Sequence, residues 1–449
     1  RYSLKNFRIG QYKAEIKSKN WFLRAYTTQE NSGDSYASTL TALAVNSAWK
    51  PNQTWFQQYT GVYSDLALSG VPEEQAHGAA RGYAETGRAE PGSAAFNTAF
   101  NNSINTSISE GGSQFADKSS LYQFEGQYNL SEYVKVVDVL VGASYRWYNL
   151  NSGGTIFADG PKYNGKIRIG ELGGYIQLQK ALLNDVLKIS ASGRFDKNEN
   201  FDGRFTPRVT ASVKIAKDNH FRLSFQQAYR FPTNQDQWIN LKTPGTFLIG
   251  SLPYFNELYD FTNNPVYTAE SIVAYRASVG TGVPNPALLK TSTFQNAKPE
   301  SMTSFEIGYR GIVAKKLLVD AYYYTSKYKD FIGREAVGRG SSGDPARYLI
   351  DLASPFTTDN YSFVKTSPTP VKASGWGIGA EYAAGKGYTI KANVYGDQLK
   401  DVPAGLITFF NTPKTRYNLG FGNANAFKGI GFNILYKWQD EVYWEGTFN

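Results

Sequence analysis

Hydrophobic and polar residues alternate with a period of two along many stretches of this chain. In "GRFTPRVTASVKIAKDNHFRLSFQQAYRFPT" (203–233), every second residue from Arg204 to Lys214 is polar, and a second alternating run follows a turn-like cluster at 217–219. A period of two places successive side chains on opposite faces of an extended strand, so the stretch predicts a β-hairpin with one apolar and one charged face. Each strand runs about ten residues. That length exceeds the roughly five or six residues typical of strands in soluble proteins and matches the roughly nine to eleven that cross a bilayer.

The same pattern recurs along the chain and predicts seven hairpins, or about fourteen strands. The paired runs are 12–17 with 21–25, 122–129 with 139–147, 171–179 with 187–195, 204–215 with 221–230, 305–310 with 319–323, 376–382 with 388–394, and 417–421 with 430–438. Connections within hairpins are short, whereas the connections between hairpins are long except for 197–203. The long ones are 28–120, 149–166, 231–303, 328–373 and 396–413. Within the first of them, "STLTALAVNSAWK" (38–50) predicts a short helix.

Short turns at one end and long loops at the other are typical of an outer-membrane barrel. We therefore predict an all-β fold, namely a transmembrane antiparallel up-and-down β-barrel with short periplasmic turns and long extracellular loops at 28–120 and 231–303. The apolar face of each strand then contacts lipid, where a charge would cost about 2–4 kcal/mol at the bilayer midplane. The lumen-facing arginines are predicted to be Arg204, Arg208, Arg222, Arg230 and Arg310. Glu171 and Glu306 are candidate partners for some of them.

Composition narrows the possible functions. The chain has 449 residues and no Cys, so disulfides and thiolate metal sites are excluded, and no apolar run approaches the ~20 residues of a membrane helix. The net charge is +9, but Lys and Arg are scattered singly along alternating strands, which argues against nucleic-acid binding. The only histidines, His77 and His220, fall at opposite ends of the predicted barrel. We therefore expect no catalytic site, no metal site and no cofactor, and we expect that the protein is not an enzyme.

Glycines alternate in "GWGIGAEY" (375–382), but no strand-to-helix context for phosphate binding surrounds them. We interpret this stretch as a strand with glycine on the lumen face.

Aromatic residues are abundant, at 15% of the chain, and many fall in the two longest loops. They either pack against each other or form a binding surface for an apolar or sugar-like ligand. The predicted ligand-binding residues are Trp49, Trp55 and Tyr59 in loop 28–120, and Trp238, Tyr254, Phe255 and Tyr259 in loop 231–303.

Several motifs, in order along the chain, resemble those of TonB-dependent outer-membrane receptors. Phe205-Thr206-Pro207-Arg208 matches an "F-x-P-R" strand, and Ala228-Tyr229-Arg230-Phe231-Pro232 matches "A-[YF]-R-x-P". "NAKPESMTSFEIGYRG" (296–311) is similar to the family strand that re-enters the barrel after a long loop, through Lys298-Pro299-Glu300, Ser304, Glu306 and Gly308. "NTPKTRYNLGFG" (411–422) resembles a later strand, and "AYTTQENSGDSY" (25–36) resembles the Bacteroidetes branch.

The resemblance implies a barrel of roughly 22 strands around an N-terminal plug domain, which is preceded by a TonB box. No plug-like segment is recognised here, and the chain ends at Phe448 and Asn449 without the usual closing strand. We therefore expect 1–449 to be the middle of such a barrel. Two open sheet edges would be unstable in lipid, so the native protein should be longer.

The function implied by the resemblance is active, TonB-dependent import of a scarce nutrient across the bacterial outer membrane. The nutrient could be an iron chelate, cobalamin, an oligosaccharide or a peptide. The implied partners are outer-membrane lipid, TonB acting through the plug, and the ligand, with a surface lipoprotein as a further candidate. Plug carboxylates are expected to meet the arginine-rich lumen face. A passive diffusion porin and a soluble, aromatic-rich carbohydrate-binding β-protein are the alternatives.

Overall fold

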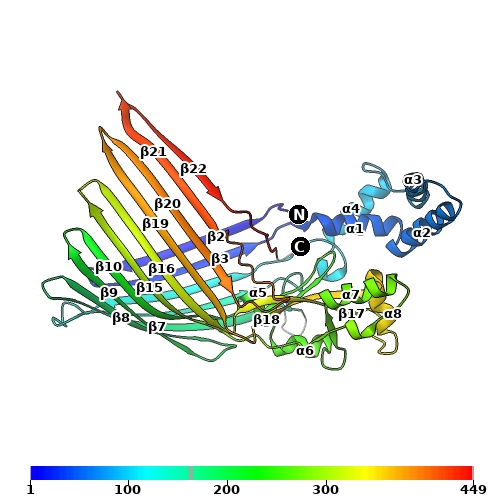
Figure 1. Cartoon of the computed structure of the whole chain (residues 1–449). Coiled ribbons are helices and arrows are strands. Elements are labelled where there is room, and N and C mark those ends of the chain that lie inside the picture. Colours follow the sequence, from blue (N-terminus) through cyan, green and yellow to red (C-terminus); the bar gives the residue numbers. More distant parts are fainter. Residues whose placement is uncertain (1, 161–164, 447–449) are drawn as a thin grey trace.

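One curved antiparallel sheet of 14 strands dominates the computed structural model, which describes residues 2–160 and 165–446 (Figure 1). Each strand pairs with the next long strand along the chain, and β2 and β22 are the two edges. The strands are β2 (Arg8–Lys17), β3 (Trp21–Asn31), β5 (Ser120–Asn129), β6 (Asp138–Leu150), β7 (Ile167–Leu182), β8 (Leu187–Asn198), β9 (Arg204–Ala216), β10 (Asn219–Arg230), β15 (Glu300–Val313), β16 (Leu317–Lys329), β19 (Val371–Gly385), β20 (Tyr388–Lys400), β21 (Thr415–Phe427) and β22 (Ile430–Gln439). Phe448, Asn449 and four residues of the predicted loop 149–166 lie outside the described residues.

All seven predicted hairpins are present, and the strands are longer than the sequence pattern indicated, up to 16 residues in β7. The turns within hairpins lie at one end of the sheet and the long connections with their helices at the other (Figure 1). In the turn between β9 and β10, Asp218 adopts a left-handed φ of 61°, which Asp tolerates better than most residues. No helix in 2–160 or 165–446 is long and apolar enough to cross a membrane.

The two faces of the sheet differ as the alternation predicted. Phe205, Val209 and Leu223 are exposed on one face, together with large apolar side chains from most of the other strands, and we call this the outer face. The opposite, inner face carries the polar residues that alternate with them. A continuous apolar surface of this size needs apolar surroundings, which a bilayer provides.

Glycines on the inner face of β19 make room for tyrosine rings. Gly377 is paired with Tyr322 of β16, and a Cβ atom on Gly377 would lie 2.6 Å from Cε1 of that ring. The interpretation of 375–382 as a strand with inward glycines is therefore confirmed.

Gly377→Ala should displace the Tyr322 ring and destabilise the barrel by about 1–3 kcal/mol, the usual cost of overpacking. The measurement is thermal unfolding of the protein refolded in detergent. Gly379→Ala is the control, because the nearest atom to its Cβ would be 3.7 Å away. Equal melting temperatures for the two variants would show that the ring moves aside freely.

The first long connection, 32–119, is largely helical. The helices are α1 (Ser38–Trp49), α2 (Asn52–Leu68), α3 (Glu73–Ala84) and α4 (Ala94–Asn105), and a small sheet pairs β1 (Tyr2–Ser3) with β4 (Tyr36–Ala37). Helix α1 packs against α4, and α2 packs against α3. Helix α1 confirms the helix predicted at 38–50, whereas the sequence interpretation contained none of the other three.

The connections 231–299 and 330–370 fold together into a second sheet, which we call the loop sheet. Its strands, in spatial order, are β11 (Asn240–Lys242), β12 (Phe247–Ile249), β18 (Thr358–Thr366), β17 (Ile332–Gly340), β13 (Val266–Thr268) and β14 (Thr291–Ser292). Strands β12 and β18 are parallel and join the two connections directly. The helices around it are α5 (Asn234–Trp238), α6 (Pro253–Tyr259), α7 (Ala269–Gly280) and α8 (Tyr348–Ala353).

Candidate functional site

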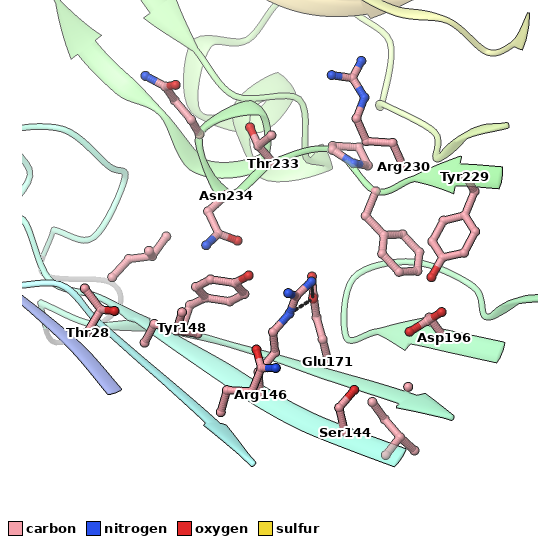
Figure 2. Close-up of a pocket in the computed structure, with 18 of the residues that line it drawn as sticks. Thr28, Ser144, Arg146, Tyr148, Glu171, Asp196, Tyr229, Arg230, Thr233 and Asn234 are labelled. Carbon is pink, nitrogen blue, oxygen red and sulfur yellow. Dashed lines mark hydrogen bonds and ion pairs between the residues drawn. The ribbon is translucent and has the colours of Figure 1, made fainter. Parts of the chain in front are cut away.

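A cavity of about 1150 Å³ opens at the loop end of the inner face (Figure 2). Its floor is the inner face of β3 and β5 to β8, and its roof is the segment that follows β10, from Phe231 to Gln235. Because inner-face residues of five neighbouring strands line one space, the sheet curves around it. We call it the loop-end cavity.

Ion pairs cover the floor of this cavity. Arg146 of β6 lies directly opposite Glu171 of β7 and donates to its carboxylate, and Asn198 Nδ2 donates to the other Glu171 oxygen at 2.8 Å. Arg194 Nε donates to Asp196 Oδ2 at 2.7 Å. The Tyr229 hydroxyl on β10 points toward Asp196 of β8 (Figure 2). Each pair neutralises its own charge, which offsets part of the cost of taking the ions out of water.

A capping box fixes the roof. Thr233 is the N-cap of α5, where its hydroxyl accepts from Asp236 N at 3.0 Å while the Asp236 carboxylate accepts from Thr233 N at 3.1 Å. Buried Gln237 donates from Nε2 to Pro232 O at 2.7 Å. The reciprocal bonds hold the chain where it leaves β10, so the roof is preorganised.

One wall of the cavity is acidic. Glu30 lies near the end of β3, and its amide donates to Ser119 O at 3.0 Å, which brings the segment 117–119 alongside. Asp117 is only 4% exposed, and its carboxylate accepts from the Ser119 hydroxyl at 2.5 Å. Burial raises the pKa of the Asp117 carboxyl, against the Ser119 hydrogen bond, and the nearby Asp159 carboxylate adds to the rise.

None of the seven predicted ligand-binding aromatics is among the described residues that line this cavity. Trp49, Trp55 and Tyr59 lie on α1 and α2, which project from the loop end (Figure 1). Trp55 stacks on Tyr59 with 5.2 Å between ring centroids. A contact between these three side chains and a ligand stays a prediction.

The other four aromatics belong to the loop sheet and its core. Phe255 is fully buried and Trp238 is 8% exposed, and both pack in one cluster, against which Tyr254 and Tyr259 lie half-buried. The Tyr259 hydroxyl donates to Asn240 Oδ1 at 2.5 Å. Mutual packing therefore accounts for Trp238 and Phe255, and in this conformation neither presents a ring to the cavity.

The five predicted inward arginines alternate along β9, β10 and β15 with the exposed apolar residues of the outer face, so they lie on the inner face. Arg222 and Arg310 share Asp320, with N–O distances of 3.3 and 3.7 Å, and Arg230 pairs with Glu300 at 3.1 Å. Asp320 and Glu300 were not anticipated, and Glu171, a suggested partner, pairs with Arg146 instead.

A second cavity of about 340 Å³ lies further along the inner face, lined by Lys188, Arg208, Arg222 and Glu306 among others. Contact of these arginines with a plug stays a prediction.

Of the residues that line the loop-end cavity, sequence reasoning named Arg230, Glu171 and the motif residues 228–232, but it did not identify them as parts of one site. Arg146, Glu171 and Arg194 lie on polar strand faces, which alternation does reveal. The pairing of Arg146 with Glu171 depends on the register of β6 against β7 across a long connection, and alternation does not supply that register. Arg194 pairs with Asp196 of its own strand. In the described part of the chain, no group of three or more His, Asp or Glu side chains is arranged to hold a metal ion.

Comparisons with known proteins agree with this architecture. Residues 2–449 match the family model described as TonB dependent receptor-like, beta-barrel. No curated protein sequence matches the chain.

Similar solved structures include a ferric enterobactin receptor (PfeA) mutant from Pseudomonas aeruginosa, with a TM-score of 0.55 and 10% identity over 96% of this chain and 49% of that one. The siderophore receptor PirA from Acinetobacter baumannii gives 0.51 and 11%, over 96% and 58%. PirA from Pseudomonas aeruginosa gives 0.50 and 10%, over 96% and 53%. The chain thus spans about half the length of these structures, and identities this low show the fold alone. They give no support to the Bacteroidetes assignment, which stays a prediction.

Proposed function

Because this chain belongs to the family of TonB-dependent receptor β-barrels, which are outer-membrane proteins, we propose that it forms the wall and outer mouth of a receptor that imports a scarce nutrient. Energy for import would come through TonB. The family consists of receptors and transporters, and in this mechanism the barrel binds and passes the nutrient without making or breaking bonds.

The loop-end cavity is the observation that carries this proposal. It lies where the inner face meets the long connections, its floor arginines Arg146 and Arg194 are held by ion pairs, and its roof is held by the capping box at Thr233. A simple diffusion pore has no need of a preorganised roof across its mouth. A cavity of this size suits a ligand of small-molecule or short-peptide dimensions.

The remaining parts of the mechanism rest on the family. We propose that a plug domain rests against the inner face, that TonB acts on this plug, and that further strands complete the barrel at the β2 and β22 edges. Iron chelates, cobalamin, oligosaccharides and peptides all stay candidate substrates, and a surface lipoprotein stays a candidate partner. The similar structures are receptors for siderophores or ferric enterobactin, so an iron chelate is the substrate to test first.

Uptake assays in paired strains test the proposal. Cells that express the full receptor should accumulate one of a panel of labelled nutrients when TonB is present and lose at least tenfold of that uptake when TonB is deleted. An inner-membrane transporter for the nutrient must be present in both strains. Equal uptake with and without TonB would favour the passive porin instead and would contradict active import.

A further inference from the structure

The side chains that line the loop-end cavity carry an unbalanced charge. In the described residues, five carboxylates and three guanidinium groups line it, a net charge of −2. The acids are Glu30, Asp117, Glu125, Glu171 and Asp196, and the bases are Arg146, Arg194 and Arg230.

Most of these charges have partners in the barrel wall itself. Glu171 and Asp196 are neutralised by the arginines beside them on the floor. Glu125 accepts from Arg24 Nη1 at 2.7 Å, and Arg230 is held by Glu300, which lies outside the cavity. The wall therefore balances its own charge everywhere except at the acidic side formed by Glu30 and Asp117.

Neither of these two carboxylates forms an ion pair with any Lys, Arg or His in residues 2–160 and 165–446. The hydroxyl of Ser119 satisfies a hydrogen bond of Asp117 but leaves its charge uncompensated. Asp117 is 96% removed from solvent, so without a counter-ion its ionised form costs stability, and a cation that entered the cavity would stabilise that form.

The same cavity offers aromatic surface to a cation. Tyr148, Phe157 and Phe231 line it together with the acidic pair. The faces of aromatic rings attract ammonium and guanidinium groups, most strongly where water is excluded. An anionic ligand would instead meet two unpaired carboxylates.

We propose that the loop-end cavity binds a cationic nitrogen group, an ammonium or guanidinium, against Glu30 and Asp117. This inference rests on the proposed import function, since it assigns the charge of the group that the receptor's mouth accepts. The group belongs either to the imported ligand, as in a basic peptide or an amine-bearing chelate, or to a lysine or arginine of the receptor itself. The chemistry is the same in both cases.

Binding of matched probes tests the ligand source. Fluorescent tri-lysine and tri-glutamate are titrated into the purified full receptor at a fixed ionic strength of about 0.15 M, where non-specific attraction is screened beyond ~8 Å. Tri-lysine should bind at least tenfold more tightly than tri-glutamate. The double variant Glu30→Gln/Asp117→Asn should abolish that preference. The control Glu74→Gln/Glu90→Gln removes the same net charge from exposed positions outside the cavity and should preserve it.

Carbodiimide coupling, which joins a carboxylate to a nearby amine, tests the internal source. If a lysine of the receptor occupies the cavity, peptide mapping of the probe-free protein should find it coupled to Glu30 or Asp117. If an arginine of the receptor occupies the cavity, it would not couple to either carboxylate. The double variant would then leave this guanidinium without a counter-charge, so it should raise the affinity for tri-glutamate and leave the affinity for tri-lysine unchanged. Either pattern supports the proposal. No tri-lysine preference, no coupling and no effect of the double variant would overturn it, and TonB-dependent uptake would persist in that case, so the import function would stand.

Discussion

A receptor that carries Leu223→Arg should lose about 2–4 kcal/mol of folding free energy in lipid bilayers and should be depleted from the outer membrane. Leu223 lies on the outer face of β10, where it is 50% exposed and pairs with Ala211 of β9 and Ile307 of β15. An arginine there would have to take its charge into hydrocarbon or distort the bilayer to reach water. The measurement is the free energy of unfolding in lipid vesicles, supported by the amount of folded protein in outer-membrane fractions.

Ser224→Arg is the matched control, one residue further along the same strand. Ser224 faces the inner side and lies directly opposite Glu306, so a new guanidinium there meets water and a carboxylate. This variant should fold within about 0.5 kcal/mol of the parent, as surface substitutions usually do. If the control were lost from the membrane and Leu223→Arg were not, the assignment of inner and outer faces would be reversed.

Phe255→Ala should destabilise the loop sheet by about 3–5 kcal/mol while the barrel still assembles. The Phe255 ring is fully buried in the cluster that includes Trp238, Phe261 and Phe363, so its removal leaves a cavity that rigid strands cannot fill. Limited proteolysis of intact cells should then cleave within 231–299 or 330–370 at a protease concentration that spares the parent.

Phe356→Ala removes the same atoms from a ring that is 67% exposed, and it should leave the proteolysis pattern almost unchanged. The barrel itself provides an internal reference, because heat-modifiable migration in gels reports its folding separately. Equal resistance of the Phe255→Ala and parent proteins would mean that the loop core does not hold these connections together.

The barrel could be predicted because the surroundings of each sheet face determine whether a residue there is apolar or polar. Lipid on one side and polar surroundings on the other enforce the period of two, and a residue such as Leu223 reveals its face without reference to any distant contact. The positions of the strand ends were predicted less well. Strand β7 runs from Ile167 to Leu182, whereas the alternating pattern covered only 171–179.

The loop sheet could not be predicted in this way. Strand β12 has three residues and pairs in parallel with β18, more than 100 residues further along the chain. Neither segment carries a length or periodicity that identifies its partner, and parallel pairing leaves no hairpin signal. The aromatic residues of the region were noticed, but burial of Trp238 and Phe255 depends on this distant pairing.

Single residues of the candidate site could be predicted from the sequence, but their arrangement around one cavity could not. Inward polar positions on β6 to β8 follow from alternation, yet the pairing of Arg146 with Glu171 follows from strand register. Asp117 stands outside any strand, and only its alignment beside Glu30 places it in the cavity wall. Charge balance in the cavity is thus a property of the folded sheet.

The parallel pairing of β12 with β18 also bears on how such a receptor can diverge. Surface loops ordinarily change length and sequence independently of each other. Here 231–299 and 330–370 contribute strands to one sheet and side chains to one core, so a change in either is felt by the other. Chimaeras between related receptors should therefore tolerate exchange of the two segments together and reject exchange of either alone, and in natural lineages the two should be inherited as one module.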